Sequence, residues 1–193
     1  AGAEYYSGGT AVCAGTLQGD THSLHGNITD NAAVIFNQIS DGTYASVLSG
    51  SGSLTKQGNA KLTLSGINTY SGGTTVSAGT LEGSTTSLQG DISNNAAVIF
   101  NQNINGTYAN VISGSGTFTK QGSATVTLSS VNTYTGGTTI SAGTLKMGVA
   151  NGLYHQGALN IAAGTFDLNN LNQAVGSLSG NGNATLGSAN FTV

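Results

Sequence analysis

Residues 70–81 read Tyr-Ser-Gly-Gly-Thr-Thr-Val-Ser-Ala-Gly-Thr-Leu, and this phrase decides the fold because the chain contains it three times. Closely similar copies begin at Tyr6 and at Tyr134, 64 residues to either side. About two-thirds of all positions agree between the first two copies, so the chain is a tandem array. The third copy starts in register and diverges after Met147. The repeats are repeat 1 at 6–69, repeat 2 at 70–133 and a divergent repeat 3 at 134–193.

Short runs of alternating apolar and polar residues fill each repeat, and Gly pairs or Asn-Gly separate them. Such runs predict half-buried strands joined by turns. In residues 59–65 one face carries Ala60, Leu62 and Leu64, and repeat 2 shows the same pattern with Ala124, Val126 and Leu128. Three equivalent places carry a second alternation, with apolar residues two positions apart: Val12 and Ala14, Val76 and Ala78, Ile140 and Ala142.

A 64-residue unit holds too many short strands for one hairpin. Solenoid proteins stack units of about 20–45 residues, so we expect three coils of about 21 residues in each repeat. The predicted fold is all-β, a right-handed parallel β-helix (β-solenoid) that forms one domain over residues 1–193. A propeller would need blades of about 40–50 residues with aromatic or Trp-Asp signatures, which are absent. Separate sandwiches would show linkers at the repeat joints, and the sequence has none there.

The composition excludes several classes of protein. Only 6% of residues are charged, against roughly 25% in an average soluble domain, and Arg, Pro and Trp are absent. Four Lys and a net charge of −3 cannot neutralise a nucleic-acid backbone. No run reaches the roughly 18–20 apolar residues that span a bilayer, so we expect no membrane insertion by this segment. No signal peptide is present, so we expect a mature or excised fragment, and a single Cys excludes an internal disulfide.

Three stretches resemble the autotransporter-associated β-strand repeat of Gram-negative bacteria. Residues 64–81 and 133–145 follow the pattern of that family closely, and residues 164–182 are similar to a phrase common between such repeats. The resemblance implies a larger precursor with a signal peptide, a β-helical passenger and a C-terminal outer-membrane barrel. It also implies export to the bacterial surface or secretion.

Members of this family are mostly adhesins and self-associating surface proteins, and a minority are proteases, esterases, toxins or host-signalling factors. The Gly-Asp-Ser-Gly of the protease passengers and the Gly-Asp-Ser-Leu of the esterase passengers are missing here. The resemblance therefore implies a chain that is not an enzyme.

The residues themselves give little sign of chemistry. His22 and His25 are spaced as metal ligands can be, but repeat 2 has Thr86 and Gln89 at those positions, so we expect solvated turn residues. His155 lies in the divergent stretch, where we expect a loop.

The acids are dispersed, with no Arg to help bind an acidic sugar: Glu4, Asp20, Asp30, Asp41, Glu82, Asp91 and Asp167. We expect no catalytic, cofactor-binding or metal-binding residue and no cofactor, and the sequence assigns no partner-binding residue.

The single cysteine and the repeated tyrosines have structural interpretations. Cys13 aligns with Ser77 and Ser141 outside the apolar alternation, so we expect an exposed, ordinary thiol. Five tyrosines recur with the repeat, and we interpret them as aromatic caps at the corners of the β-helix rather than as partner anchors. They are Tyr6, Tyr44, Tyr70, Tyr108 and Tyr134.

Two functions remain open at this point. The first is an adhesin-type passenger that binds a host cell-surface or extracellular-matrix protein, with weak contacts multiplied along the rod. The second is a structural spacer, with the function elsewhere in the precursor. Unpaired coil edges also predict some self-association of the isolated fragment.

Overall fold

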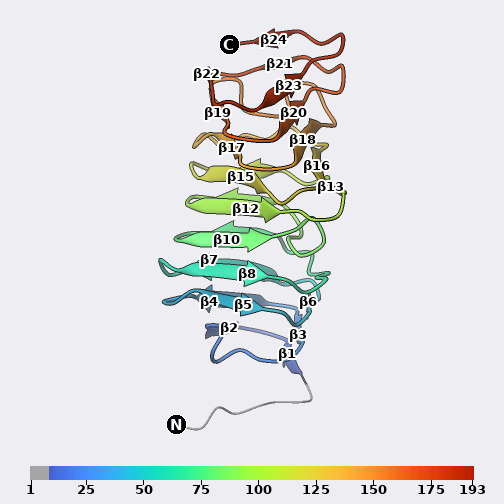
Figure 1. Ribbon diagram of the computed structural model, residues 1–193. Coiled ribbons are helices and arrows are strands. Elements are labelled where there is room, and N and C mark those ends of the chain that lie inside the picture. The colour runs from blue at the N-terminus through green and yellow to red at the C-terminus, as the bar shows by residue number, and fades with distance from the viewer. Residues whose placement is uncertain (1–8) are drawn as a thin grey trace.

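Parallel coils stack into a single rod in the computed structural model, which describes residues 9–193 (Figure 1). All strand pairs described are parallel, for example β10 with β8 and with β12. Each coil therefore satisfies the backbone hydrogen-bonding groups of the next. The predicted all-β parallel β-helix is confirmed. None of the described segments is a helix of the length and apolar character needed to cross a membrane.

The rod has three faces, and the chain visits them in turn. The first face begins with a sheet in the order β1 (Thr10–Val12), β3 (Ile28–Asp30), β6 (Leu48–Ser49). Farther along, it holds a sheet in the order β13 (Gly106–Tyr108), β16 (Thr125–Leu128), β18 (Thr144–Met147), β20 (Thr165–Asp167), β23 (Asn183–Thr185). The irregular segments 65–70 and 84–90 bridge these two sheets, because Thr69 N donates to Leu48 O and Asn68 N to Thr86 O.

The second face holds a six-stranded sheet in the order β14 (Ile112–Ser113), β11 (Ile92–Asn94), β9 (Thr74–Val76), β7 (Ser53–Gln57), β4 (Ala33–Asn37), β2 (Thr16–Gly19). It continues through irregular coils to the pair β21 (Gln173–Ala174) and β24 (Phe191–Thr192).

The third face is one eight-stranded sheet, so eight successive coils cross it. The order is β22 (Ser177–Ser179), β19 (Ala158–Ile161), β17 (Thr138–Ile140), β15 (Thr117–Gln121), β12 (Ala97–Asn101), β10 (Thr80–Gly83), β8 (Lys61–Leu64), β5 (Gly42–Tyr44).

The length of a coil follows from the strand register on the third face. Leu81 pairs with Leu62 below it and with Val98 above it, and Val98 pairs with Phe118. These coils therefore take 19, 17 and 20 residues, and three of them span the 56 residues from Leu62 to Phe118. A 64-residue repeat exceeds three coils by eight residues, which is the length of one more face. The prediction of three coils of about 21 residues is wrong, and the repeat makes about three and one-third coils.

The extra third of a coil turns each repeat by one face relative to the last. Strand β4 lies on the second face, whereas β12, its equivalent in repeat 2, lies on the third. In the same way β8 lies on the third face and its equivalent β16 on the first. Equivalent side chains of successive repeats therefore point in different directions from the rod rather than forming one stripe.

A continuous apolar core fills the rod. Leu62, Leu64 and their equivalents in repeat 2 are buried, as the alternation predicted, whereas Ala60 and Ala124, which precede those strands, are only half-buried. Aromatic rings also stack inside, with ring centroids 5.5 Å apart for Phe100 and Phe118. Each buried side chain of this size contributes roughly 1.5–3 kcal/mol to folding.

The second predicted alternation is only half right. Val12, Val76 and Ile140 are buried, but each is the last residue of its strand. The Ala two positions later lies on a turn, where period 2 no longer applies. These residues are exposed (Ala14) or half-buried (Ala78 and Ala142).

Candidate functional site

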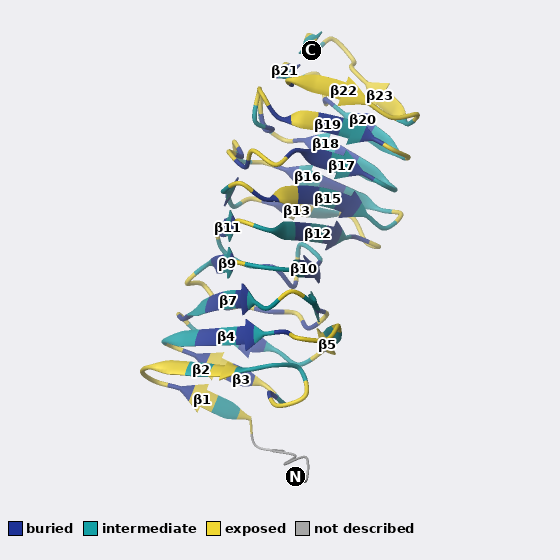
Figure 2. Ribbon diagram, turned by 90° about the vertical axis from the view of Figure 1, so that its left-hand side faces the viewer, coloured by how far each residue is buried: buried dark blue, intermediate teal, exposed yellow. Residues whose placement is uncertain are grey.

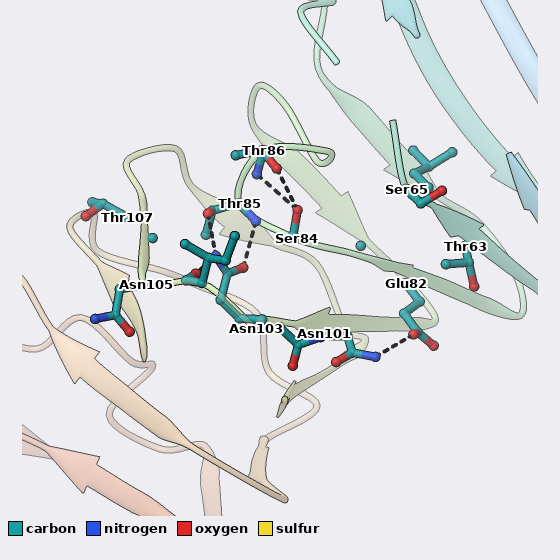
Figure 3. Close-up of a pocket in the computed structure, with 15 residues that line it drawn as sticks. Thr63, Ser65, Glu82, Ser84, Thr85, Thr86, Asn101, Asn103, Asn105 and Thr107 are labelled. Atoms are coloured by element: carbon teal, nitrogen blue, oxygen red, sulfur yellow. Dashed lines mark hydrogen bonds between the residues drawn. The ribbon is translucent and has the colours of Figure 1, made fainter. Parts of the chain in front are cut away.

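A groove opens where the third face meets the first, with a cavity volume of about 570 Å³ (Figure 3). Its walls come from three successive coils, at residues 63–65, 82–86 and 101–107. Each segment leaves the end of a third-face strand, so the strand register sets their spacing. We call this the 63–107 groove. Hydroxyl and amide side chains of Ser, Thr, Asn and Gln make up most of its lining.

Gln102 fixes the shape of the groove. Its side chain is only 3% exposed, and its Nε2 donates to Thr85 Oγ1 at 2.9 Å and to the carbonyl oxygen of Ile104 at 2.6 Å. Thr85 N in turn donates to Gln102 Oε1 at 3.0 Å. One amide therefore ties the 84–86 turn to the 102–106 loop. This clamp makes the groove a preformed feature of the fold, because the side chains are ordered before any ligand arrives.

Glu82 supplies the carboxylate in the groove lining, and its charge is compensated. Lys61 Nζ lies 3.0 Å from Glu82 Oε2, and Asn101 Nδ2 donates to Glu82 Oε1 at 2.9 Å. Burial by itself would raise the pKa of Glu82, but these hydrogen bonds and the Lys61 charge outweigh it and hold the pKa below its usual value. The groove is therefore close to neutral. A lone, ion-paired carboxylate lacks the second carboxylate that glycoside hydrolysis needs.

The outer wall of the groove is exposed and mostly polar. Asn103, Asn105 and Thr107 are exposed. Ile104 stands beside them with 81% of its surface exposed. The groove thus presents hydrogen-bond donors and hydrogen-bond acceptors together with one exposed aliphatic side chain.

The sequence-predicted histidines lie apart from this groove. His22 is an exposed turn residue, as predicted, with Nδ1 3.6 Å from Asp20 Oδ2. His25 is half-buried rather than solvated, and His155 lies exposed in a turn, where a loop was predicted. Among residues 9–193 no three His, Cys, Asp or Glu side chains gather as metal ligands would. Glu4 lies outside the described residues.

Cys13 is exposed, as predicted. Four of the five repeated tyrosines lie among the described residues, and all four are buried inside the rod. Their hydroxyl groups are bonded there, for example Tyr70 to Thr74 Oγ1 at 2.7 Å and Tyr134 to Thr138 Oγ1 at 2.6 Å. They are structural groups and not partner anchors. Tyr6 lies outside the described residues.

Two buried lysines were missed by sequence reasoning. Lys56 and Lys120 are fully buried, and each Nζ donates to three backbone carbonyls. For Lys120 these are the carbonyls of Gln121, Gly122 and Ala142, at 2.6–3.1 Å. Burial lowers the pKa of both ammonium groups to about 8. The signal was present in the sequence, because each Lys lies two positions after an inward residue, Leu54 or Phe118.

Comparison with known proteins gives a consistent picture. The model of the Passenger-associated-transport-repeat family matches residues 1–18, 54–82 and 118–147. The chain is similar to the Adhesin BmaC autotransporter of Brucella suis biovar 1 (strain 1330), with 34% identity over 199 residues. That alignment covers 84% of this chain and 6% of the relative, so the chain spans only a small part of the relative's length. No solved structure matches the chain.

Proposed function

We propose, from the premise that this chain is a segment of an autotransporter passenger domain built from passenger-associated-transport-repeats, that it is an adhesin-type binding module and not an enzyme. Such a segment is exposed at the bacterial surface or secreted. The expected partner is a molecule of the host cell surface or the extracellular matrix. The word "adhesin" in the name of the Brucella relative supports this choice.

The observation that carries the proposal is the 63–107 groove. It is preformed, uncharged overall and open to the side of the rod, so a partner can reach it without any rearrangement of the coils. Its lining can donate and accept hydrogen bonds but offers no paired carboxylates for acid–base catalysis. These are the properties of a binding surface.

A spacer role is the second candidate, and one observation favours it. Repeats 1 and 2 share most of their residues, so the rod can lengthen by whole units without disturbing its core. In that role the segment would only hold a distal part of the parent protein away from the cell.

Deleting residues 70–133 separates the two candidates. Because a repeat makes three and one-third coils, the deletion shortens the rod by about 16 Å at ~4.8 Å per coil. It also turns everything after the joint by one face and removes two walls of the groove. The core should survive, because residues 134–146 then follow repeat 1 as residues 70–82 do now.

The measurement is saturable binding of the purified chain to cultured mammalian cells and to coated matrix proteins, beside the deletion variant. Binding by the intact chain that the deletion variant loses, while still folded, supports the binding module. Equal binding by both supports a module whose contacts lie outside repeat 2. No binding by either contradicts the proposal and leaves the spacer.

A further inference from the structure

We propose that the 63–107 groove binds a neutral saccharide. This inference rests on the proposed binding function and names the class of ligand that the groove takes.

An acidic ligand does not fit the charge of the groove. Its one neighbouring cation, Lys61, is already bonded to Glu82 at 3.0 Å and is held there by the Glu82–Asn101 contact on the other side. No Arg exists in the chain to offer a bidentate site to carboxylate, sulfate or phosphate. A sulfated or sialylated ligand would have to break this ion pair, and the groove would then hold two negative charges.

An extended peptide does not fit the backbone of the groove. Peptides add to a sheet through an unpaired strand edge, but β10, which leads into the 82–86 wall, is bonded to β8 on one side and to β12 on the other. Nor does the rim carry the aromatic or Arg anchors that dominate protein interfaces. Ile104 is the one large apolar side chain that stands fully in solvent there.

A hydroxyl-rich, uncharged ligand matches what remains. Each sugar hydroxyl both donates and accepts a hydrogen bond, and so do Thr and Ser hydroxyls and the two ends of an Asn amide. Asn103, Thr107 and Ser65 offer these groups from the rim and the floor, and all three are exposed. The C–H face of a sugar ring can pack on the aliphatic Ile104. A volume of about 570 Å³ lies within the usual range of small-molecule sites, roughly 300–1,000 Å³.

The equivalent loop of repeat 1 suggests a variant that removes the exposed Asn side chains of the groove rim while the loop stays folded. Its equivalent loop reads Ile39-Ser40-Asp41 where repeat 2 has Asn103-Ile104-Asn105. Gln38 makes the same clamp there, donating to Thr21 Oγ1 at 2.6 Å and to Ser40 O at 2.9 Å.

The exchange keeps the Gln102 clamp, and it also keeps the hydrogen bond that residue 105 accepts from Thr125 N. Asp41 Oδ1 accepts from Lys61 N at 2.8 Å, as Asn105 Oδ1 accepts from Thr125 N at 2.9 Å. The triple change N103I/I104S/N105D should therefore fold as the native loop does, while it replaces the rim amides and adds a negative charge.

The experiment is an array of neutral oligosaccharides with terminal mannose, galactose, glucose or N-acetylglucosamine, beside sialylated and sulfated ones, followed by calorimetric titration of any hit. Two further arms distinguish the sources of such sugars, namely host-type glycoprotein glycans and purified bacterial surface polysaccharide. The matched controls are the reverse exchange I39N/S40I/D41N in repeat 1 and the pair T107V and T43V. Thr43 is the exposed equivalent of Thr107 outside the groove.

We expect binding to neutral sugars that falls at least about tenfold in N103I/I104S/N105D and falls in T107V, with the reverse exchange and T43V unchanged. No neutral sugar bound, acidic sugars bound in preference, or equal loss in both sets of variants would each overturn the inference. Cell binding that persists in N103I/I104S/N105D would overturn the groove inference alone and leave the proposed function standing.

Discussion

Repeats 1 and 2 agree at about two-thirds of their positions but lie in different surroundings, and strands β2 and β10 show the effect of those surroundings. Leu81 in β10 is fully buried between β8 and β12. Leu17, its equivalent in β2, is only half-buried, because β2 is the last described strand of its sheet. Figure 2 shows the same gradient, with exposed strands β2, β22 and β23 toward the two ends and buried strands between them. Burial of a solenoid residue is thus a property of the neighbouring coils and not of its own repeat.

The groove follows the same rule. Its outer wall belongs to repeat 2, but residues 63–65 in its floor belong to repeat 1. The equivalent loop of repeat 1 has the same clamp, with Gln38 in place of Gln102. A site built from two adjoining repeats therefore depends on residues of both.

Truncation of the equivalent leucines Leu81 and Leu17 should give the largest difference between the two repeats. L81A removes a fully buried side chain from the middle of the rod and should cost about 2–5 kcal/mol of the free energy of unfolding. L17A should cost less than about 1 kcal/mol, because the half-buried site can relax. Urea unfolding followed by circular dichroism measures both. Equal losses would show that the position within the repeat, and not the neighbouring coil, sets the cost.

Substitution of the two buried lysines should cost the two repeats a similar amount of stability. Both ammonium groups lie between coils and hold three carbonyls each, so K56M and K120M should each cost about 1–3 kcal/mol through carbonyls left without a donor. K146M is the control. Lys146 is partly exposed, 3.7 Å from Asp167, and such a pair contributes only about 0–1 kcal/mol. A K120M protein as stable as the parent chain would contradict the capping role.

The same lysines predict a pH dependence. Their pKa of about 8 in the folded state lies below the ordinary value of 10.5, so between those values the unfolded chain binds more protons. The free energy of unfolding should therefore rise from pH 8 toward pH 10, by at most about 1.4 kcal/mol per pH unit and lysine. Above pH 10 it should fall again, since burial raises the pKa of Tyr44 to about 12 and unfolded tyrosines ionise first. Thermal melts of the parent chain and of K56M/K120M test this, and a rise that persists in the double variant would refute it.

The smallest expected difference in stability comes from one buried position, which is Asn94 in repeat 2 and Asp30 in repeat 1. Asn94 in repeat 2 donates through Nδ2 to Thr117 O at 2.8 Å, and its Oδ1 accepts from Ala96 N. Asp30, its equivalent, accepts from Ala32 N but has no amide to donate. D30N should therefore raise stability by about 0.5–1.5 kcal/mol, and N94D should lower it by a similar amount. Melting temperatures that move the same way in both variants would speak against this account.

Much of the fold was predictable because repetition and period-2 alternation are local properties of the chain. The 64-residue repeat, the inward side chains of residues 62, 64, 126 and 128 and the exposure of Cys13 all follow from the sequence alone. Errors occurred where strands stop, as at Ala14 and Ala78, because a turn ends the alternation without any change of composition. The inward lysines are hard to foresee for a different reason, because lysine side chains are mostly exposed, although the alternation places Lys56 and Lys120 on the buried face.

Strand formation, the 64-residue recurrence and the stacking of parallel coils can thus be read from residue patterns along the chain. The number of coils in a repeat cannot, because small differences in coil length add up in the folded rod to three and one-third coils per repeat instead of three. The extra third of a coil places equivalent residues of successive repeats on different faces. It also determines which loop of one repeat lies next to a given turn of the other. The 63–107 groove arises from such a meeting, through contacts between residues about 20 and 40 positions apart that no local pattern encodes.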